Sequence, residues 1–100
     1  MTNLEMDFTR NLLEQLSKAE ETTGIPETRL KSQTEQQGGV KAMKNYLRRG
    51  QTTRQVEKLK QMGRLELSPE YLVTKGKYGP LFTDQEVDLC LQVLLDAGAF

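Results

Sequence analysis

The 100-residue chain has no histidine, no tryptophan and a single cysteine, Cys90. Zinc sites are commonly built on histidine and cysteine, and the usual nucleophilic centres pair serine or cysteine with histidine. The lack of histidine excludes such sites within one chain, together with haem ligation by histidine. One cysteine forms no internal disulfide, which agrees with a reducing compartment. We therefore expect no metal and no organic cofactor.

Long apolar runs and phosphate-binding glycine loops are also missing. No run approaches the ~18 apolar residues that span a bilayer. Glu5 and Asp7 stand where a secretory signal would have a basic start and an apolar run. The pair Gly38 and Gly39 lacks the spacing and the Lys-Ser/Thr of a phosphate loop. We expect a cytoplasmic protein with no membrane partner.

Carboxylates are the chemistry that remains for an enzyme. Glu20 and Glu21 fall on an expected helix surface, and Asp84, Glu86 and Asp88 fall at an expected helix start. Acidic side chains are common at both places without any catalytic role. We therefore predict that the chain is not an enzyme and acts by binding.

Length and composition indicate a single folded unit. A chain of this length has one core and a radius of gyration of about 13 Å. Hydrophobic residues make up 36% and charged residues 28% of the chain, which is typical of a globular protein. Apolar residues recur at helical spacing, and the one alternating run, 64–67, has no partner strand. We predict an all-α fold, a compact bundle of five or six short helices, with residues 1–100 as one domain.

Caps, glycines and prolines mark the ends of the expected helices. Thr2 and Thr83 each begin a Thr-x-x-Glu capping box, and Thr52 with Gln55 stands in the same relationship. Ser68 caps a short helix with proline at its first position. The expected helices cover residues 2–22, 26–37, 40–49, 52–62, 68–73 and 83–97, with a connector at 64–67 that buries Leu65 and Leu67 and a glycine-rich loop at 75–80.

The first and last helices are expected to supply most of the core. The last helix is apolar on more than one face, which is typical of a central helix or of one shared with another chain. We favour the core, and the alternative is a homodimer through this helix. Phe100 is expected to pack onto the fold. The apolar positions are Val87, Cys90, Leu91 and Leu94 on one stripe, and Leu89, Val93 and Leu95, the homodimer interface residues, on the rest.

Charge is segregated along the chain although it sums to zero. Residues 1–37 hold seven acids and four bases, net −3, and residues 65–100 hold six acids and two bases, net −4. Residues 38–64 hold one acid and eight bases, net +7. Bases spaced by three and four share one helix face. The candidate binding residues are Lys41, Lys44, Arg48, Arg49, Arg54, Lys58 and Arg64.

This segment predicts contact with nucleic-acid backbone phosphates through two adjacent basic helices. Lysine and arginine neutralise phosphates with release of counterions. Gln51, Thr52 and Thr53 at a helix start would add N–H and hydroxyl donors. In the alternative interpretation the basic faces are merely solvated and paired with the acidic flanks, which the zero net charge favours.

A helix-turn-helix interpretation of residues 16–30 is weaker. Ala19, Gly24 and Leu30 loosely match the alanine, turn glycine and second-helix apolar residue of repressor-type readers. The register fails by one residue at Gly24, and Glu27 and Glu35 are poorly suited to a groove lined by phosphates.

The second half of the chain carries an extended motif. It consists of Arg49-Gly50-x-Thr52-Thr53, then Gly63-Arg64-Leu65-Glu66-Leu67-Ser68 with Glu70 and Leu72-Val73, then Leu81-Phe82-Thr83 with Glu86. This motif resembles a pattern in short uncharacterised proteins of Firmicutes and their mobile elements. The resemblance implies a small stand-alone protein carried by bacteria or their phages. It brings no site residue, because no activity is known for the group.

Small mobile-element proteins commonly act by occupying a surface on a larger machine. A second hypothesis is therefore an inhibitor or adaptor of a host nucleic-acid enzyme, of the anti-restriction or anti-CRISPR type. Its acidic segments would mimic phosphates while the basic helices bind an acidic partner, and charge complementarity would set partner choice. The partner is thus nucleic acid or a protein that processes it.

Overall fold

The computed structural model describes residues 2–50 and 53–98, and every regular element within them is helical. Its radius of gyration is 12.3 Å. The prediction of an all-α bundle is confirmed, whereas the predictions for Gln51, Thr52 and Phe100 lie outside the described residues. The elements are α1 (Asn3–Thr23), α2 (Thr28–Gln37), α3 (Gly39–Arg48), α4 (Val56–Met62), α5 (Pro69–Val73) and α6 (Asp84–Asp96), with 3-10 helices η1 (Leu65–Leu67) and η2 (Gly76–Leu81).

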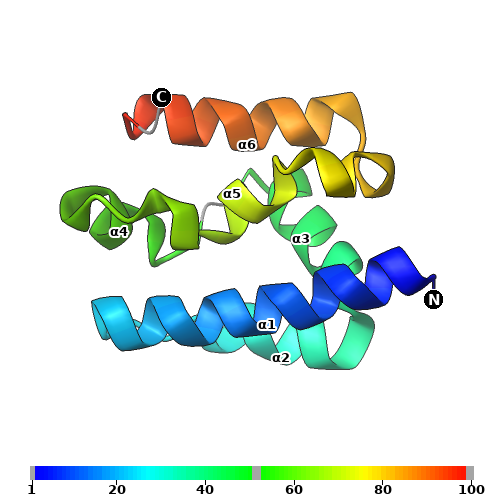
Figure 1. Ribbon diagram of the computed structural model, residues 1–100, viewed down its shortest axis with the longest axis horizontal. Coiled ribbons are helices and arrows are strands. Elements are labelled where there is room, and N and C mark those ends of the chain that lie inside the picture. Colours follow the sequence, from blue (N-terminus) through cyan, green and yellow to red (C-terminus); the bar gives the residue numbers. More distant parts are fainter. Residues whose placement is uncertain (1, 51–52, 99–100) are drawn as a thin grey trace.

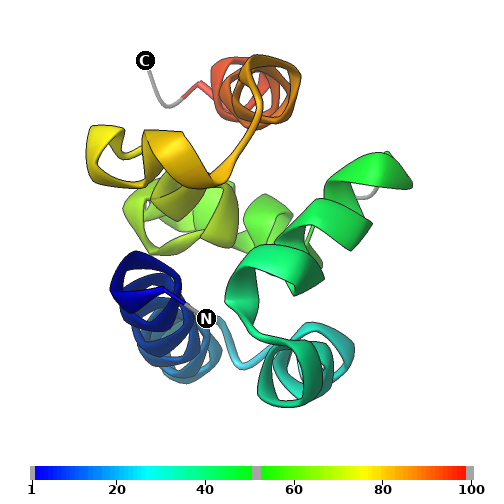
Figure 2. The ribbon, with the colours of Figure 1, turned by 90° about the vertical axis from the view of Figure 1, so that its right-hand side faces the viewer.

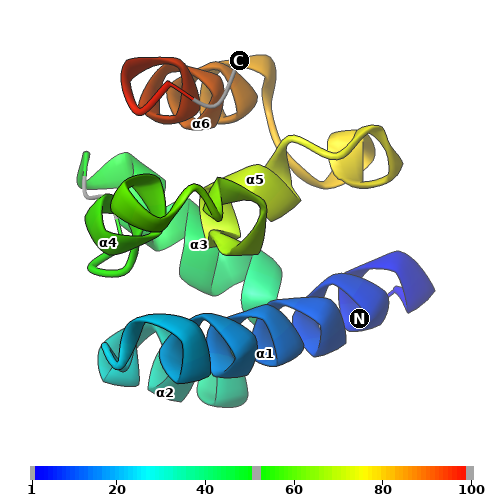
Figure 3. The same cartoon turned by 60° about the vertical axis from the view of Figure 1, so that its left-hand side comes forward.

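The helices are arranged in three levels, as Figure 1 shows. The helices α1 and α2 form one outer level and α6 the other, while α3, α4 and α5 lie between them. Figure 2 shows α3 rising from the level of α1 and α2 toward α6, and α3 packs against all three. In Figure 3, α4 lies over the C-terminal part of α1, against which it packs.

Capping boxes begin α1 and α6, as the sequence predicts. The Thr2 hydroxyl accepts the Glu5 N–H at 3.1 Å, and the Glu5 carboxylate accepts the Thr2 N–H at 3.0 Å. Thr83 and Glu86 exchange the same two bonds at 3.1 and 2.8 Å. Each box satisfies two N–H groups that a helix start otherwise leaves unpaired.

The connections differ from the prediction in three places. The glycine-rich segment expected to be a loop contains η2, and the connector contains η1, in which Leu65 is buried and Leu67 half-buried. The helix expected from residue 52 begins only at Val56, and the Gln55 side chain makes no capping bond. The residues just before Val56 are instead bound by side chains of other helices.

Two groups of buried side chains form the core. In the larger, Phe8 makes edge-to-face contacts with Tyr78 and Phe82, with ring centres 5.0 and 5.2 Å apart. The smaller joins the end of α1 to α4 and α6. Its buried members are Ala19, Val56, Leu59, Leu65 and Leu94.

The core is supplied by α1 and α3 more than by α6, so the prediction is right for the first helix and wrong for the last. Only Cys90 and Leu94 are fully buried on α6, which packs on one side and faces outward on the other. Leu89 and Leu95 remain 41% and 53% exposed. Six positions apart, they point roughly 120° away from each other around the helix axis and so form no single stripe.

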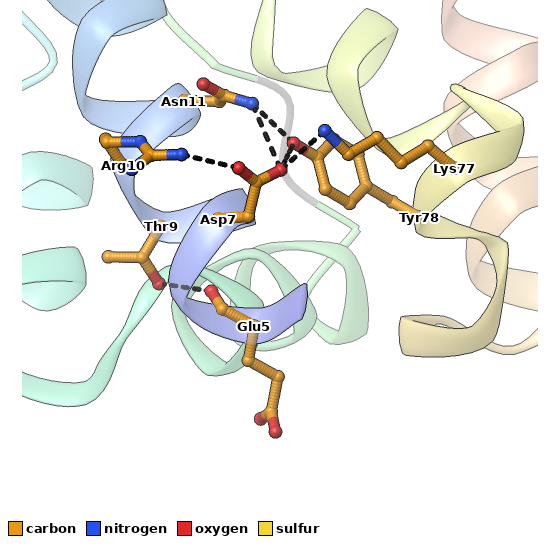
Figure 4. A network of polar contacts seen from close by, with 7 residues as sticks. All are labelled: Glu5, Asp7, Thr9, Arg10, Asn11, Lys77 and Tyr78. Carbon is orange, nitrogen blue, oxygen red and sulfur yellow. Dashed lines mark hydrogen bonds and ion pairs between the residues drawn. The ribbon is translucent and has the colours of Figure 1, made fainter. Parts of the chain in front are cut away.

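A polar network around Asp7 joins α1 to η2, as Figure 4 shows. The Asp7 carboxylate lies 2.6 Å from Arg10 and 2.7 Å from Lys77, and it accepts the Tyr78 hydroxyl at 2.7 Å. Hydrogen bonds from Lys77 and Tyr78 lower the pKa of Asp7 to about 2. The network therefore links the first half of α1 to η2 through the Asp7 carboxylate.

Candidate nucleic-acid interface

Three candidate bases lie on one face of α3, as their spacing predicts. Lys41, Lys44 and Arg48 all fall within the continuous helix. Lys41 and Arg48 are exposed, whereas Lys44 is half-buried. The three bases therefore share one face of the helix, but they differ in their exposure to solvent.

Lys44 is committed to the fold. Its ammonium nitrogen lies 2.8 Å from Glu86 of α6 and 5.5 Å from the centre of the Phe82 ring. Burial raises the pKa of Glu86, but the bonds from Lys44 and Thr83 outweigh it and lower the pKa overall. This candidate is matched by a flanking acid, as the solvated-face interpretation expects.

Arg64 is also matched within the chain. Its Nε lies 2.6 Å from the Glu66 carboxylate, and both side chains are about half exposed. The hydrogen bond from Arg64 lowers the pKa of Glu66. Such an exposed pair contributes about 0.2–1 kcal/mol to stability. Arg64, like Lys44, is therefore paired with a carboxylate of the same chain, and its role in binding stays a prediction.

The other five candidates are exposed cations. Within residues 2–50 and 53–98, no carboxylate lies within ion-pair distance of any of them. Arg54 and Lys58 are four residues apart and exposed, whereas Val56 and Leu59 of α4 are buried. We call these five the basic surface: Lys41, Arg48, Arg49, Arg54 and Lys58.

The basic helices do not form the adjacent pair that the sequence predicts. In the described part of the chain α3 packs mainly on α1, α2 and α6, whereas α4 packs mainly on η1 and α1. The basic residues instead lie along the chain on both sides of the connection between the two helices. Arg48 and Arg49 stand at its start and Arg54 near its end, with Lys58 in the first turn of α4 and Lys41 two turns back on α3.

Two buried carboxylates from distant helices hold this connection. Glu70 of α5 accepts the Thr53 N–H at 3.0 Å and the Thr53 hydroxyl at 3.1 Å. Glu27, at the start of α2, accepts the Gln55 N–H at 2.7 Å. Thr53, which is 3% exposed, is therefore occupied by Glu70, and the prediction that its donors reach a phosphate is wrong. Glu27 points into the protein and not outward from α2, where the helix-turn-helix interpretation places it.

Burial shifts the ionisation of both carboxyl groups. Desolvation raises the pKa of Glu70, and the bonds from Thr53 offset it only in part. Desolvation also raises the pKa of Glu27, against the main-chain N–H groups of Gln55 and Arg54, and the charge of Glu70 adds to the increase. The sequence gives no signal for these residues, because an acid in the first turn of a helix is usually exposed.

Two residues of the basic surface line hollows on the protein surface. Arg48 lines a groove of about 470 Å³ with Gln85 and the exposed Leu89, between the end of α3 and the start of α6. Lys41 lines a separate hollow beside α1. In the described residues no group of three or more histidine, cysteine or acidic side chains is placed to hold a metal ion. The same residues include no helix that is both long and apolar enough to cross a membrane.

No protein-family model, curated protein or solved structure matches the chain. The resemblance to proteins of Firmicutes and their mobile elements therefore stays a prediction.

Proposed function

We propose that the chain is a non-catalytic binding protein that contacts the backbone phosphates of nucleic acid through the basic surface. One observation carries the proposal: five exposed cations between Lys41 and Lys58 have no carboxylate partner within the described residues. Of the seven candidate residues, Lys44 and Arg64 are the two that pair with a carboxylate in the part of the chain that the structure describes. A cluster of this kind attracts a polyanion even though the whole chain is neutral.

The chemistry favours backbone contact over base recognition. Three of the five residues are arginines, whose planar guanidinium groups bind phosphate oxygens in pairs. Five phosphate contacts predict that the logarithm of the binding constant falls with the logarithm of salt concentration with a slope of about −4.5 on duplex DNA. We expect little dependence on base sequence, because backbone contacts carry no sequence information.

Fluorescence anisotropy with labelled short duplexes and single strands of random sequence tests the proposal. The triple variant Arg48→Gln, Arg49→Gln, Arg54→Gln should make the slope shallower, reducing its magnitude by about 3. Its matched control, Lys18→Gln, Arg29→Gln, Lys31→Gln, removes the same charge from exposed positions on α1 and α2 and should leave the slope nearly unchanged. Equal losses in the two triples, or no binding by the unmutated chain at about 25 mM salt, would contradict the proposal.

A protein partner is the second candidate, because Leu89 lies exposed in the groove beside Arg48. An apolar side chain makes no favourable contact with a backbone phosphate, whereas it can be buried in the core of a protein interface. In this candidate the chain is a mobile-element inhibitor or adaptor that binds a host nucleic-acid enzyme. Inhibition of a restriction or CRISPR nuclease that persists at salt concentrations where DNA binding is lost would favour it. Leu89→Ala should then weaken the inhibition and the control Leu95→Ala should not.

Self-association through α6 is the remaining alternative. The exposed Leu89 and Leu95 point to different flanks of the helix, so each offers only a small apolar contact. We expect light scattering at high micromolar concentration to give the monomer mass of 11.4 kDa. A dimer that Leu89→Glu dissociates would support self-association instead.

A further inference from the structure

The turn before α4 is bonded on both sides of one exposed arginine. On one side, Thr53 donates both its N–H and its hydroxyl to Glu70, which is 1% exposed. On the other side, Gln55, which is fully buried, donates its N–H to Glu27 at 2.7 Å and its side-chain amide to the Ile25 carbonyl at 2.7 Å. Arg54 stands between them and is exposed.

These hydrogen bonds are unusual because their acceptors include two buried carboxylates. Transferring a carboxylate out of water is unfavourable unless charge-assisted hydrogen bonds compensate the lost hydration, so a buried acid is a poor choice for stability alone. Both acids here direct their oxygens at main-chain N–H groups within three consecutive residues. Glu70 belongs to α5 and Glu27 directly precedes α2, and they lie 17 and 28 residues away from their partners along the chain. The turn is therefore fixed to two separate helices.

We propose that Glu27 and Glu70 are positioning residues for the basic surface: they fix the main chain of residues 53–55 so that Arg54 makes one defined phosphate contact. This role rests on the proposed function. An arginine on a fixed main chain loses less conformational freedom on binding than one on a mobile turn, which strengthens the contact. Neither carboxylate touches the ligand.

Charge and position make opposite predictions for these two acids. Removing either carboxylate raises the net charge by one, so a purely electrostatic effect strengthens binding to a polyanion. Loss of the anchor weakens binding, because Arg54 is no longer held. The pair Glu70→Ala and Glu70→Gln separates the two effects, since both changes remove the same charge while glutamine keeps an acceptor for the Thr53 N–H.

The experiment measures the salt dependence of duplex binding for this pair. We expect Glu70→Ala to lower the slope by about 1, as Arg54→Gln does, and Glu70→Gln to retain the unmutated slope. Adding Arg54→Gln to Glu70→Ala should cause no further loss. The exposed acid Glu57 of α4 provides the control, because its alanine and glutamine variants should bind alike. Hydrogen exchange of the Thr53 amide, which Glu70 accepts, should accelerate in Glu70→Ala and not in Glu70→Gln.

Equal binding and equal exchange by Glu70→Ala and Glu70→Gln would overturn the inference. If Glu70→Ala does not fold, the pair Glu27→Ala and Glu27→Gln replaces it, since Glu27 accepts the Gln55 N–H and glutamine keeps an acceptor for it. Glu27→Ala should accelerate exchange of the Gln55 amide and weaken binding, and Glu27→Gln should do neither. Equal exchange and equal binding by these two variants would overturn the inference. Failure of the unmutated chain to bind nucleic acid would overturn the proposed function and this role together. The exchange measurement would still show whether the anchor exists.

Discussion

The ammonium group of Lys44 lies 2.8 Å from the carboxylate of Glu86 and faces the ring of Phe82. The contact joins α3 to the first turn of α6. Glu86 also accepts the N–H of Thr83 in the capping box, so one carboxylate serves both the helix start and the interhelical contact. A base in the middle of the α3 stripe is thereby used for the fold, while its neighbours Lys41 and Arg48 face solvent.

The first prediction separates structural from binding lysines on the same helix face. Lys44→Met should lower the free energy of unfolding in urea by about 1 kcal/mol, because it removes a half-buried charged hydrogen bond. Lys41→Met should change stability by less than about 0.5 kcal/mol and instead lower the salt slope of binding by about 1. The reverse assignment, with binding lost in Lys44→Met and stability lost in Lys41→Met, would contradict the account.

The second prediction concerns the close approach of α3 to α1. The Gly39 N–H donates to the Thr9 hydroxyl at 2.8 Å, and a Cβ at Gly39 would lie 3.1 Å from both Thr9 Cα and Phe8 Cδ1. Gly39→Ala should therefore lower the free energy of unfolding by about 1–3 kcal/mol, although alanine favours helices. Gly76→Ala is the control, because nothing lies within 4 Å of a Cβ there. A melting temperature of Gly39→Ala above that of the unmutated chain would contradict this prediction, because it would show that α3 moves away from α1 at little cost.

The third prediction concerns acid stability and Asp7. The pKa of Asp7 is lowered from 3.8 to about 2, so the folded state binds the proton more weakly than the unfolded chain. Its contribution to stability is present above about pH 4 and is lost as the pH falls through about 2. The urea midpoint of Asp7→Asn should lie below that of the unmutated chain at neutral pH and approach it near pH 2 to 3. A difference that does not depend on pH, or one equal to that of the exposed control Asp88→Asn, would contradict this role.

The fourth prediction has the opposite sign and concerns Glu70. Burial raises its pKa above the ordinary value of 4.5, so the folded state binds the proton more tightly than the unfolded chain. This contribution favours folding below about pH 4.5 and is lost as the pH rises through the folded-state pKa. The free energy of unfolding of Glu70→Gln, measured relative to the unmutated chain, should therefore increase from about pH 4 to about pH 7. A constant or decreasing difference would show that Glu70 is not desolvated.

Local features of the fold were predictable from the sequence, and long-range contacts were not. The capping boxes at Thr2 and Thr83 depend on residues three positions apart, so the pattern alone identifies them. The burial of Glu27 and Glu70 depends on partners 28 and 17 residues away, which no local pattern records. Which faces of α6 are covered also depends on contacts with distant parts of the chain. Its apolar composition therefore led to the prediction of too large a share of the core.

The candidate site was predictable in part for the same reason. Helical spacing correctly places Lys41, Lys44 and Arg48 on one face of α3. Spacing does not show that Lys44 meets Glu86, because the two residues are 42 positions apart. The ion pair between Arg64 and Glu66 is an exception to this limit. The two residues are only two positions apart, so their opposite charges can be read directly from the sequence.

The salt dependence of nucleic-acid binding by the unmutated chain, set beside that of the Arg48, Arg49, Arg54 triple glutamine variant, tests the central claim most directly. The account predicts binding at about 25 mM salt, a slope of about −4.5 on duplex DNA, and a slope reduced by about 3 in the variant. Absence of binding, or identical slopes for the two proteins, would contradict it.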